Sequence, residues 1–406
     1  MHTLKALIAK DSFIVLVDQV ISSGTNFCLT LMLAQKLDIK SFGLYSSIVL
    51  LLYLAVSIMN ALVIQPFQVM VVKIEKKKQY ITALFLGIVL LLFIPPVLMV
   101  ILSHYFIETS LFPVSTGALI CFVTGFLIND FFRKLLLGLS RIKTVLTMDI
   151  LFLVLVVLVL NKVNLSQVLI IIGLSNLIAT LPGFLFMMNN YEKPLLWRLY
   201  AAAHLKQGKW LFSVAVVQWS SSNFFILIAG VYLGIEALGA LRLVQSFFGI
   251  INIGLQTIEN YFLPKIALLY HHNVTVAKEY LLRLTFVGAI IFGLLTLIFF
   301  IFSNQIIVLA GGQKYQHYGY VIKMVAVLYF FIFLGYPIRI AVRILMLNKI
   351  FFMGYLFSFS TSLVTFHFLL KYSGLYGAVT GLIINQIIMI LYWKYQLHKK
   401  QFQLWK

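Results

Sequence analysis

Long apolar segments alternate with short polar ones along this chain. Each apolar segment is about 20 residues long, the length that an α-helix needs to cross the hydrocarbon core of a bilayer. Helices are expected because every backbone amide must be bonded inside lipid, and a barrel would show short alternating segments instead. The pattern predicts about twelve spans, at residues 12–37, 42–64, 80–103, 112–132, 144–161, 165–188, 210–233, 238–262, 284–303, 319–342, 350–370 and 375–395.

The polar residues of the first two spans return in the second half of the chain. Residues 22–27 (Ser-Ser-Gly-Thr-Asn-Phe) are matched by residues 220–224 (Ser-Ser-Ser-Asn-Phe). Residues 37–43 (Leu-Asp-Ile-Lys-Ser-Phe-Gly) are matched by residues 233–239 (Leu-Gly-Ile-Glu-Ala-Leu-Gly). Such internal repeats are typical of transporters, with the substrate site between the repeats. We therefore predict two pseudo-symmetric six-helix bundles around a central cavity.

The repeat divides the chain into three predicted parts. Residues 1–188 form an N-terminal six-helix bundle, residues 210–406 form a C-terminal one, and residues 189–209 join them. In this linker, apolar residues recur at helical spacing beside basic ones, which predicts an amphipathic helix on the cytoplasmic membrane surface. The apolar residues are Leu195, Leu199, Ala202 and Leu205.

Composition supports an all-α integral membrane protein. The chain is 62% hydrophobic and 10% charged, with a mean hydropathy of +1.03, whereas a soluble domain carries about 25% charged residues. The segment after Met1–Lys10 is long and lacks a small-residue cleavage site, so we expect the first helix to be retained as a span.

The net charge of +20 reports membrane topology rather than a nucleic-acid partner. Of the 31 Lys and Arg residues, 24 fall on the side of the predicted membrane that holds both termini, and five fall on the other side. Cytoplasmic loops carry this excess of positive charge, so both termini are predicted to be cytoplasmic.

The eighth predicted span carries a polar stripe. Its polar residues and one glycine recur at steps of three and four residues, which places them on one helical face. The members are Arg242, Gln245, Gly249, Asn252, Gln256 and Glu259. Lipid would leave these groups unsatisfied, so the stripe must face a wet cavity or a polar partner helix. It predicts a substrate path, and the alternative is a packed polar seam between helices.

Weaker polar faces on the first, second and seventh spans add further candidate path residues. These are Asp18, Asn26, Asn60 and Gln218. A carboxylate inside a span is costly unless it is paired or protonated, which makes Asp18 a candidate for coupling transport to an ion. Glu259, near the predicted cytoplasmic mouth, is a second candidate, and the alternative is that it pairs with Lys265.

Other ionisable residues near the cytoplasmic ends of spans are expected to pair locally. We predict that Asp130 pairs with Arg133 and Lys134, and that Asp149 pairs with Lys143. The sequence contains no Ser/His/acid set, no phosphate-binding glycine loop and no metal-binding spacing. We therefore expect no enzymatic activity, no cofactor and no metal, and an ATP-driven mechanism within this single chain is excluded.

Short motifs resemble those of Wzx-type polysaccharide and O-antigen flippases. These flippases belong to the multidrug/oligosaccharidyl-lipid/polysaccharide (MOP) exporter superfamily. The motifs are Asp18-Gln19 with Ser23, Asn26-Phe27, Phe42-Gly43-Leu44-Tyr45, residues 309–315 (Leu-Ala-Gly-Gly-Gln-Lys-Tyr) and Tyr376-Gly377-Ala378. The resemblance extends over the chain in length and in number of spans, and it implies a V-shaped, MATE-like pair of six-helix bundles.

The resemblance also implies a function. It implies alternating-access transport of an undecaprenyl-diphosphate-linked oligosaccharide outward across the bacterial inner membrane, with a polysaccharide polymerase and a chain-length regulator as partners. Family members use cationic cavity residues for the diphosphate, and Arg242 is the main candidate here. The alternative is an ion-coupled antiporter of drugs or small metabolites from the same superfamily. A structural scaffold would leave the polar stripe unexplained.

Overall fold

Of the residues that the computed structural model describes, 92% are helical and none is in a strand. The described residues are 2–71, 74–92, 94, 97, 114–157, 164–193, 196–400 and 402. Within the helices, the side chains of residues 2–13, 15, 16, 90, 91, 250, 253, 256–261, 264 and 271 lie outside this description. The predicted all-α membrane fold class is confirmed.

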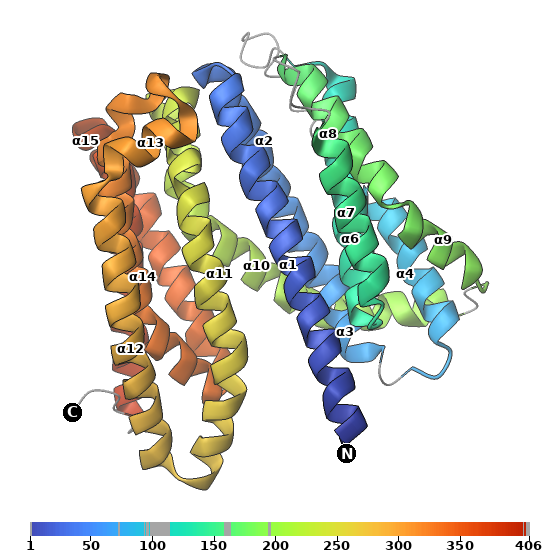
Figure 1. The fold of residues 1–406 in the computed structure, drawn as a ribbon. Coiled ribbons are helices and arrows are strands. Elements are labelled where there is room, and N and C mark those ends of the chain that lie inside the picture. Colours follow the sequence, from blue (N-terminus) through green and yellow to red (C-terminus); the bar gives the residue numbers. More distant parts are fainter. Residues whose placement is uncertain are drawn as a thin grey trace. The chain divides into compact units, whose positions relative to one another are not determined.

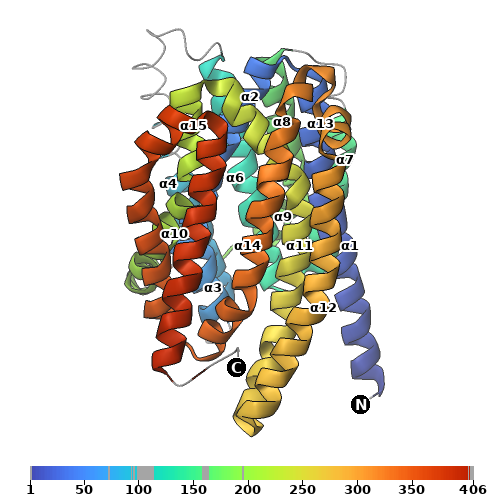
Figure 2. The same ribbon diagram turned by 90° about the vertical axis from the view of Figure 1, so that its left-hand side faces the viewer.

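Long helices run through both halves of the chain (Figures 1 and 2). In the first half they are α1 (His2–Lys36), α2 (Ile39–Met59), a π-helix (Asn60–Ile64), α3 (Gln65–Met70), α4 (Lys77–Leu92), α6 (Thr116–Gly138), α7 (Ile142–Val156), α8 (Leu165–Ala179) and α9 (Leu181–Asn189). In the second half they are α10 (Trp197–Leu233), α11 (Ile235–His272), α12 (Val274–Ile301), α13 (Ser303–Gly311), the 3-10 helix η3 (Gln313–Tyr318), α14 (Gly319–Ile344) and α15 (Asn348–Lys399).

Among the described residues, six helical stretches are long and apolar enough to cross a membrane. They are Ile39–Met70, Leu165–Asn189, Trp197–Leu233, Val274–Ile301, Gln313–Ile344 and Asn348–Lys399. Residues 98–113, which contain the end of the third predicted span and the start of the fourth, lie outside the described residues. The number of twelve spans therefore stays a prediction.

The chain forms two compact units. Unit 1 contains Met1–Leu37 and Leu51–Val216, and unit 2 contains Asp38–Leu50 and Val217–Lys406. Helices α2 and α10 each contribute residues to both units. The bundle limits expected from the repeat, at residues 188 and 210, stay a prediction.

In unit 1, α6 and α8 cross at small residues. A Cβ on Gly125 would lie 2.3 Å from the carbonyl oxygen of Gly173, and a Cβ on Gly173 would lie 2.6 Å from the backbone of Cys121. Real atoms do not approach so closely, so only glycine allows this crossing. Small residues that let two backbones meet are common in membrane proteins, where dispersion contacts replace the hydrophobic effect as the force between helices.

Unit 2 contains an equivalent close crossing between the first turns of α2 and α11. A Cβ on Gly43 would lie 2.3 Å from the carbonyl oxygen of Ile235, and a Cβ on Gly239 would lie 2.9 Å from the Cα of Gly43. These two glycines close the matched motifs at residues 37–43 and 233–239. The repeat in the sequence is therefore a point of contact in the structure.

The start of α2 is fixed by a side-chain cap. The backbone N–H of Ser41 donates to Oδ2 of Asp38 at 3.0 Å, which satisfies one of the free amides of the first turn. Burial works to raise the pKa of the Asp38 carboxyl, but hydrogen bonds from Ser41 and nearby backbone amides outweigh burial and lower that pKa. The cap is therefore ionised at neutral pH, as the positive end of a helix dipole favours.

Helix α15 is two helices joined at Gly374. This residue has φ 52° and ψ −130°, a conformation that side chains other than glycine rarely adopt. Three residues later, a Cβ on Gly377 would lie 1.8 Å from the carbonyl oxygen of Leu369. The break falls between the predicted spans 350–370 and 375–395.

The linker expected at residues 189–209 is continuous with the next span, because α10 extends from Trp197 to Leu233 without interruption. Its first turns belong to unit 1 and pack inside it. Tyr200 and His204 are buried there, and Gly208 lies against Leu62 of the π-helix. From Trp197 on this segment is helical, and one of its faces is buried against protein, while its place on the membrane surface stays a prediction.

Candidate functional site

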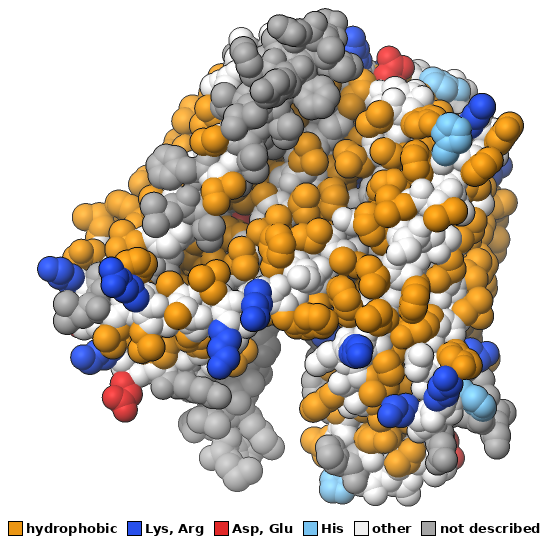
Figure 3. Space-filling model, turned by 180° about the vertical axis from the view of Figure 1, so that it is seen from behind, with side chains coloured by type: hydrophobic (Ala, Val, Ile, Leu, Met, Phe, Trp, Pro, Cys, Tyr) orange, Lys and Arg blue, Asp and Glu red, His pale blue; other side chains and the backbone are white. Residues whose placement is uncertain are grey.

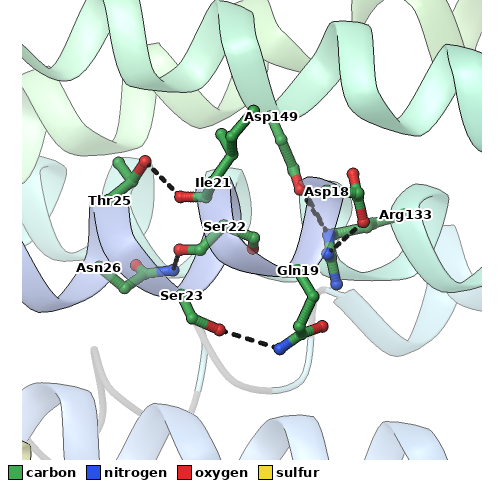
Figure 4. A network of polar contacts seen from close by, with 9 residues as sticks. All are labelled: Asp18, Gln19, Ile21, Ser22, Ser23, Thr25, Asn26, Arg133 and Asp149. Atoms are coloured by element: carbon green, nitrogen blue, oxygen red, sulfur yellow. Dashed lines mark hydrogen bonds and ion pairs between the residues drawn. The ribbon is translucent and has the colours of Figure 1, made fainter. Parts of the chain in front are cut away.

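An acid–base cluster joins α1, α6 and α7 inside unit 1. Arg133 Nη2 donates to Oδ2 of Asp18 at 2.7 Å, and Arg133 Nε donates to Oδ2 of Asp149 at 3.0 Å. Figure 4 shows Arg133 and Asp149 approaching Asp18 on one side of α1. One guanidinium thus bridges two carboxylates from two different helices.

The two carboxylates of this cluster are buried. Asp18 is 1% exposed and Asp149 is also buried. Among the described residues, no group donates a hydrogen bond to the second carboxylate oxygen of Asp18, Oδ1, although that atom is buried. With both acids ionised, two negative charges would share one positive charge, and binding one proton would make the cluster neutral. The carboxylates of this cluster therefore outnumber its cation by one.

A second polar group lies next to the first on α6. Lys134 Nζ donates to Oδ2 of Asp130 at 2.6 Å and to Oδ1 of Asn60 at 2.9 Å. Asn60 is the first residue of the π-helix that interrupts α2. Such π-helical turns often occur at functional sites, because they free backbone groups and redirect side chains. Two adjacent residues of α6 therefore contact predicted path residues: Arg133 pairs with Asp18, and Lys134 donates to Asn60.

Another face of α1 carries exposed amides and hydroxyls. Gln19 Nε2 donates to Ser23 Oγ at 2.9 Å, and Asn26 Nδ2 donates to the carbonyl of Ser22 at 2.9 Å. Figure 4 shows Gln19 and Ser23 pointing away from the cluster of Asp18. Helix α1 therefore has a buried charged side and an open polar side.

In unit 2 the stripe on α11 forms the more open face of that helix. Arg242 Nη1 donates to Gln245 Oε1 at 3.1 Å, and Asn252 Nδ2 donates to the hydroxyl of Tyr329 at 2.6 Å. Arg242, Gln245 and Gly249 are half-buried and Asn252 is exposed. Residues between the stripe positions are packed inside unit 2. These are Phe248, Ile251 and Leu255.

The side chains of Gln256 and Glu259 lie outside those described, so the carboxyl-terminal part of the stripe stays a prediction. Gln218 is half-buried on α10 in unit 2. One turn further along α10, Ser221 enters a buried neutral network with two helical segments of α15. Its hydroxyl bonds Ser358 Oγ at 2.9 Å, and its carbonyl accepts from Asn385 Nδ2 at 3.1 Å.

The structure corrects one predicted ion pair. Asp149 pairs with Arg133 rather than with Lys143, because α7 packs beside α6 and α1 and directs its carboxylate inward. The local pair of Asp130 with Lys134 is confirmed, and Arg133, the other partner expected for Asp130, instead pairs with Asp18 and Asp149. Arg133 is the central residue of the cluster, but the sequence placed it only in a local pair with Asp130 and did not make it a candidate site residue. The available signal was that Asp18 lies inside a span and needs a cationic partner from another span.

Comparisons with known proteins identify the fold. No protein-family model matches the sequence, and no curated protein matches it. Three solved structures, each 12% identical in sequence, superpose on it along nearly its whole length. The inward closed conformation of the lipid II flippase MurJ matches 97% of this chain and 89% of its own, with a TM-score of 0.72.

The other two structures are MATE transporters. An inward-facing multidrug resistance MATE family transporter of the MOP superfamily matches 94% of this chain and 95% of its own, with a TM-score of 0.69. An aspartate-to-asparagine mutant of the Vibrio cholerae MATE transporter VcmN matches 98% of each chain, with a TM-score of 0.62. The chain therefore has the fold that MurJ and MATE transporters share, as the expected MATE-like architecture required.

Proposed function

We propose that this protein is a flippase for a lipid-linked oligosaccharide. It moves an undecaprenyl-diphosphate-linked repeat unit from the cytoplasmic to the periplasmic leaflet of the bacterial inner membrane, in the synthesis of O-antigen or capsule. The observation that carries this proposal is the fold shared with MurJ, whose name gives a lipid-linked substrate. A polysaccharide polymerase and a chain-length regulator are the partners that such a product requires.

The stripe on α11 supports a path for a polar head group. Amide and guanidinium groups at Arg242, Gln245 and Asn252 offer hydrogen bonds to sugars and a positive charge to a diphosphate. Asn26, Asn60 and Gln218 add further amides. Few of these groups are charged, which suits a large sugar head group that must bind and then leave.

The acid–base cluster supports coupling to a proton. Asp18 has one oxygen held by Arg133 and one buried oxygen without a donor among the described residues, so protonation of Oδ1 removes a buried charge. Protonation would also weaken the attraction between Arg133 and α1. Glu259 remains a second candidate for coupling.

Reconstituted transport tests the proposal. The purified protein is placed in liposomes that carry a fluorescent undecaprenyl-diphosphate oligosaccharide, and an impermeant quencher reports the fraction in the outer leaflet. We expect the protein to raise the rate of exchange between leaflets, the Arg242→Ala variant to lose most of that rate, and Arg242→Lys to restore only part of it, because lysine cannot bind a diphosphate bidentately. A rate equal to that of empty liposomes would disprove the flippase.

The second candidate is an ion-coupled antiporter of drugs or small metabolites, which the likeness to MATE transporters favours. A cell-based efflux assay separates the two functions. An antiporter would lower the accumulation of a fluorescent cationic drug and leave the lipid-linked oligosaccharide in its original leaflet. A flippase would leave the accumulation of the drug unchanged and move the lipid-linked oligosaccharide to the other leaflet.

A further inference from the structure

The amino-terminal turns of α10 expose a basic and apolar face. We define the outer face of α10 by its residues Arg198, Leu199, Leu205, Lys206, Lys209 and Trp210, all of which are exposed. Leu199 and Leu205 are 63% and 64% exposed. Figure 3 shows Lys and Arg side chains lying among exposed hydrophobic ones on one face of the molecule.

The opposite side of the same turns is held by other residues of unit 1. His204 Nδ1 lies 3.2 Å from the carbonyl oxygen of Leu62, and because a carbonyl only accepts, this nitrogen carries the proton. The other ring nitrogen, Nε2, lies 2.7 Å from the hydroxyl of the buried Tyr80. Gly208, one turn later, packs on Leu62. The outer face is therefore held in one orientation by contacts on its reverse side.

Helix length places this face at the surface of the membrane. Helix α10 has 37 residues, so it is about 55 Å long, whereas the hydrocarbon core is about 30 Å thick. Its carboxyl-terminal half carries no charged residue, since the last one in the helix is Lys209, so the amino-terminal turns are the part that extends beyond the core. Tryptophan at position 210 suits the boundary, since indole prefers the interface between lipid and water.

The charge on this face has one sign. No aspartate or glutamate occurs between Glu192 and Glu236 in the sequence. Three cations beside three large apolar side chains match the surface of a bilayer with anionic head groups, because the apolar groups enter the acyl boundary while the cations meet phosphates. An acidic protein partner would leave the leucines without an apolar counterpart.

We infer that the outer face of α10 binds anionic phospholipid, such as phosphatidylglycerol, at the cytoplasmic surface. The inference does not depend on the transported substrate. It assigns Arg198, Lys206 and Lys209 to lipid phosphates, and Leu199, Leu205 and Trp210 to the acyl boundary. Lipid bound there would contact the same turns that His204 and Gly208 attach to the π-helix of α2.

Quenching of Trp210 fluorescence by brominated lipid tests this inference. The full-length protein is placed in two kinds of nanodisc. One contains brominated phosphatidylglycerol in unlabelled phosphatidylcholine, and the other contains brominated phosphatidylcholine in unlabelled phosphatidylglycerol, with the same fraction of brominated lipid in both. The contribution of Trp210 is the difference between the parent and its Trp210→Phe variant. We expect severalfold stronger quenching by brominated phosphatidylglycerol, since each nearby cation strengthens attraction to an anionic surface about fivefold.

A charge-matched pair of variants makes the test specific. In R198Q/K206Q/K209Q the preference for phosphatidylglycerol should disappear while quenching by phosphatidylcholine remains. In the control K394Q/K399Q/K400Q, which removes three exposed lysines at the end of α15 in unit 2, the preference at Trp210 should persist. Equal quenching by the two lipids in the parent, a preference that survives in R198Q/K206Q/K209Q, or no quenching by either lipid would overturn the inference.

Discussion

Arg133 is the residue on which the charge balance of unit 1 depends. It bridges Asp18 and Asp149, both of which are buried, so its guanidinium compensates two carboxylates at once. A carboxylate can lose its charge by binding a proton. In the described part of the chain, however, no second cation pairs with Asp18 or Asp149 and could replace the charge of Arg133. The two acids and the arginine therefore have different predicted phenotypes.

We expect Arg133→Gln to destabilise the folded protein strongly. Removing one partner from a buried ion pair costs about 3–5 kcal/mol, and the 18% exposure of this side chain places the expected loss toward the lower figure. The measurement is the midpoint of thermal unfolding in detergent. Arg141→Gln is the control, because Arg141 is exposed and only stacks over the ring of Phe186. Equal midpoints for the two variants would contradict a structural role for Arg133.

We expect Asp18→Asn to leave the thermal midpoint close to that of the parent and to reduce transport. Arg133 retains Asp149, and the amide occupies the volume of the carboxyl without its titratable proton. If Asp18 couples transport to a proton, the variant should also lose the dependence of transport on the pH gradient. Transport measured with and without an imposed gradient gives the answer. A gradient response like that of the parent would leave Asp18 with a structural role only.

At the scale of the element, α11 separates polar from packed positions by helical periodicity. Its stripe is open or half-buried, whereas Phe248, Ile251 and Leu255 are packed within unit 2. The residues of the stripe and the core residues therefore occupy different faces of the helix, and chance spacing of polar residues does not account for this separation. The two sets of positions should react differently with solvent.

We expect single cysteines at positions 245, 249 and 252 to react with a water-soluble thiol reagent in membranes. Cysteines at 248, 251 and 255 should stay unreactive because those side chains are buried against neighbouring helices. The experiment requires a background without Cys28 and Cys121. Position 249 is the safest probe, since a Cβ on Gly249 meets nothing within 4 Å. Uniform labelling around the helix, or none on the stripe, would favour the packed polar seam.

The crossing of α2 and α11 depends on glycine because the two backbones approach each other closely there. A Cβ on Gly43 would lie 2.3 Å from the carbonyl oxygen of Ile235, which cannot move without shifting the helix. We expect Gly43→Ala to destabilise the protein by about 1–3 kcal/mol, the usual cost of overpacking. Thermal unfolding in detergent measures it.

Gly249→Ala is the matched control for this prediction. The same substitution is made in the middle of a long helix, but in open space, so it should be neutral or stabilising by up to about 1 kcal/mol. If Gly43→Ala and Gly249→Ala behaved alike, the close approach of α2 and α11 would be absent from the folded protein.

At the scale of the whole molecule, the distribution of Lys and Arg predicts both termini in the cytoplasm. Reporter fusions after Lys406 and within residues 104–110 should therefore report opposite sides of the membrane. Both fusion sites lie outside the described residues, so this prediction depends on the sequence pattern. Fusions that report the same side would contradict the twelve-span topology.

The sequence by itself determined the helical membrane fold and its repeat. Apolar segments of about 20 residues leave a backbone no alternative to helix in lipid, so the class follows from composition and length. The stripe on α11 was also visible, because residues three and four positions apart share a helical face whatever surrounds it. The break in α15 at Gly374 fell where the sequence expected two spans to meet.

Only the tertiary structure decided which helices are neighbours. The partner of Asp18 is 115 residues away in sequence, and nothing local indicates that α6 rather than another helix supplies its cation. The same holds for Asp149, whose nearest lysine in sequence suggested a different pair. The contact between Gly43 and Gly239 and the attachment of His204 to Leu62 likewise arise from packing. Periodicity determines the face of a helix, but only packing determines what that face meets.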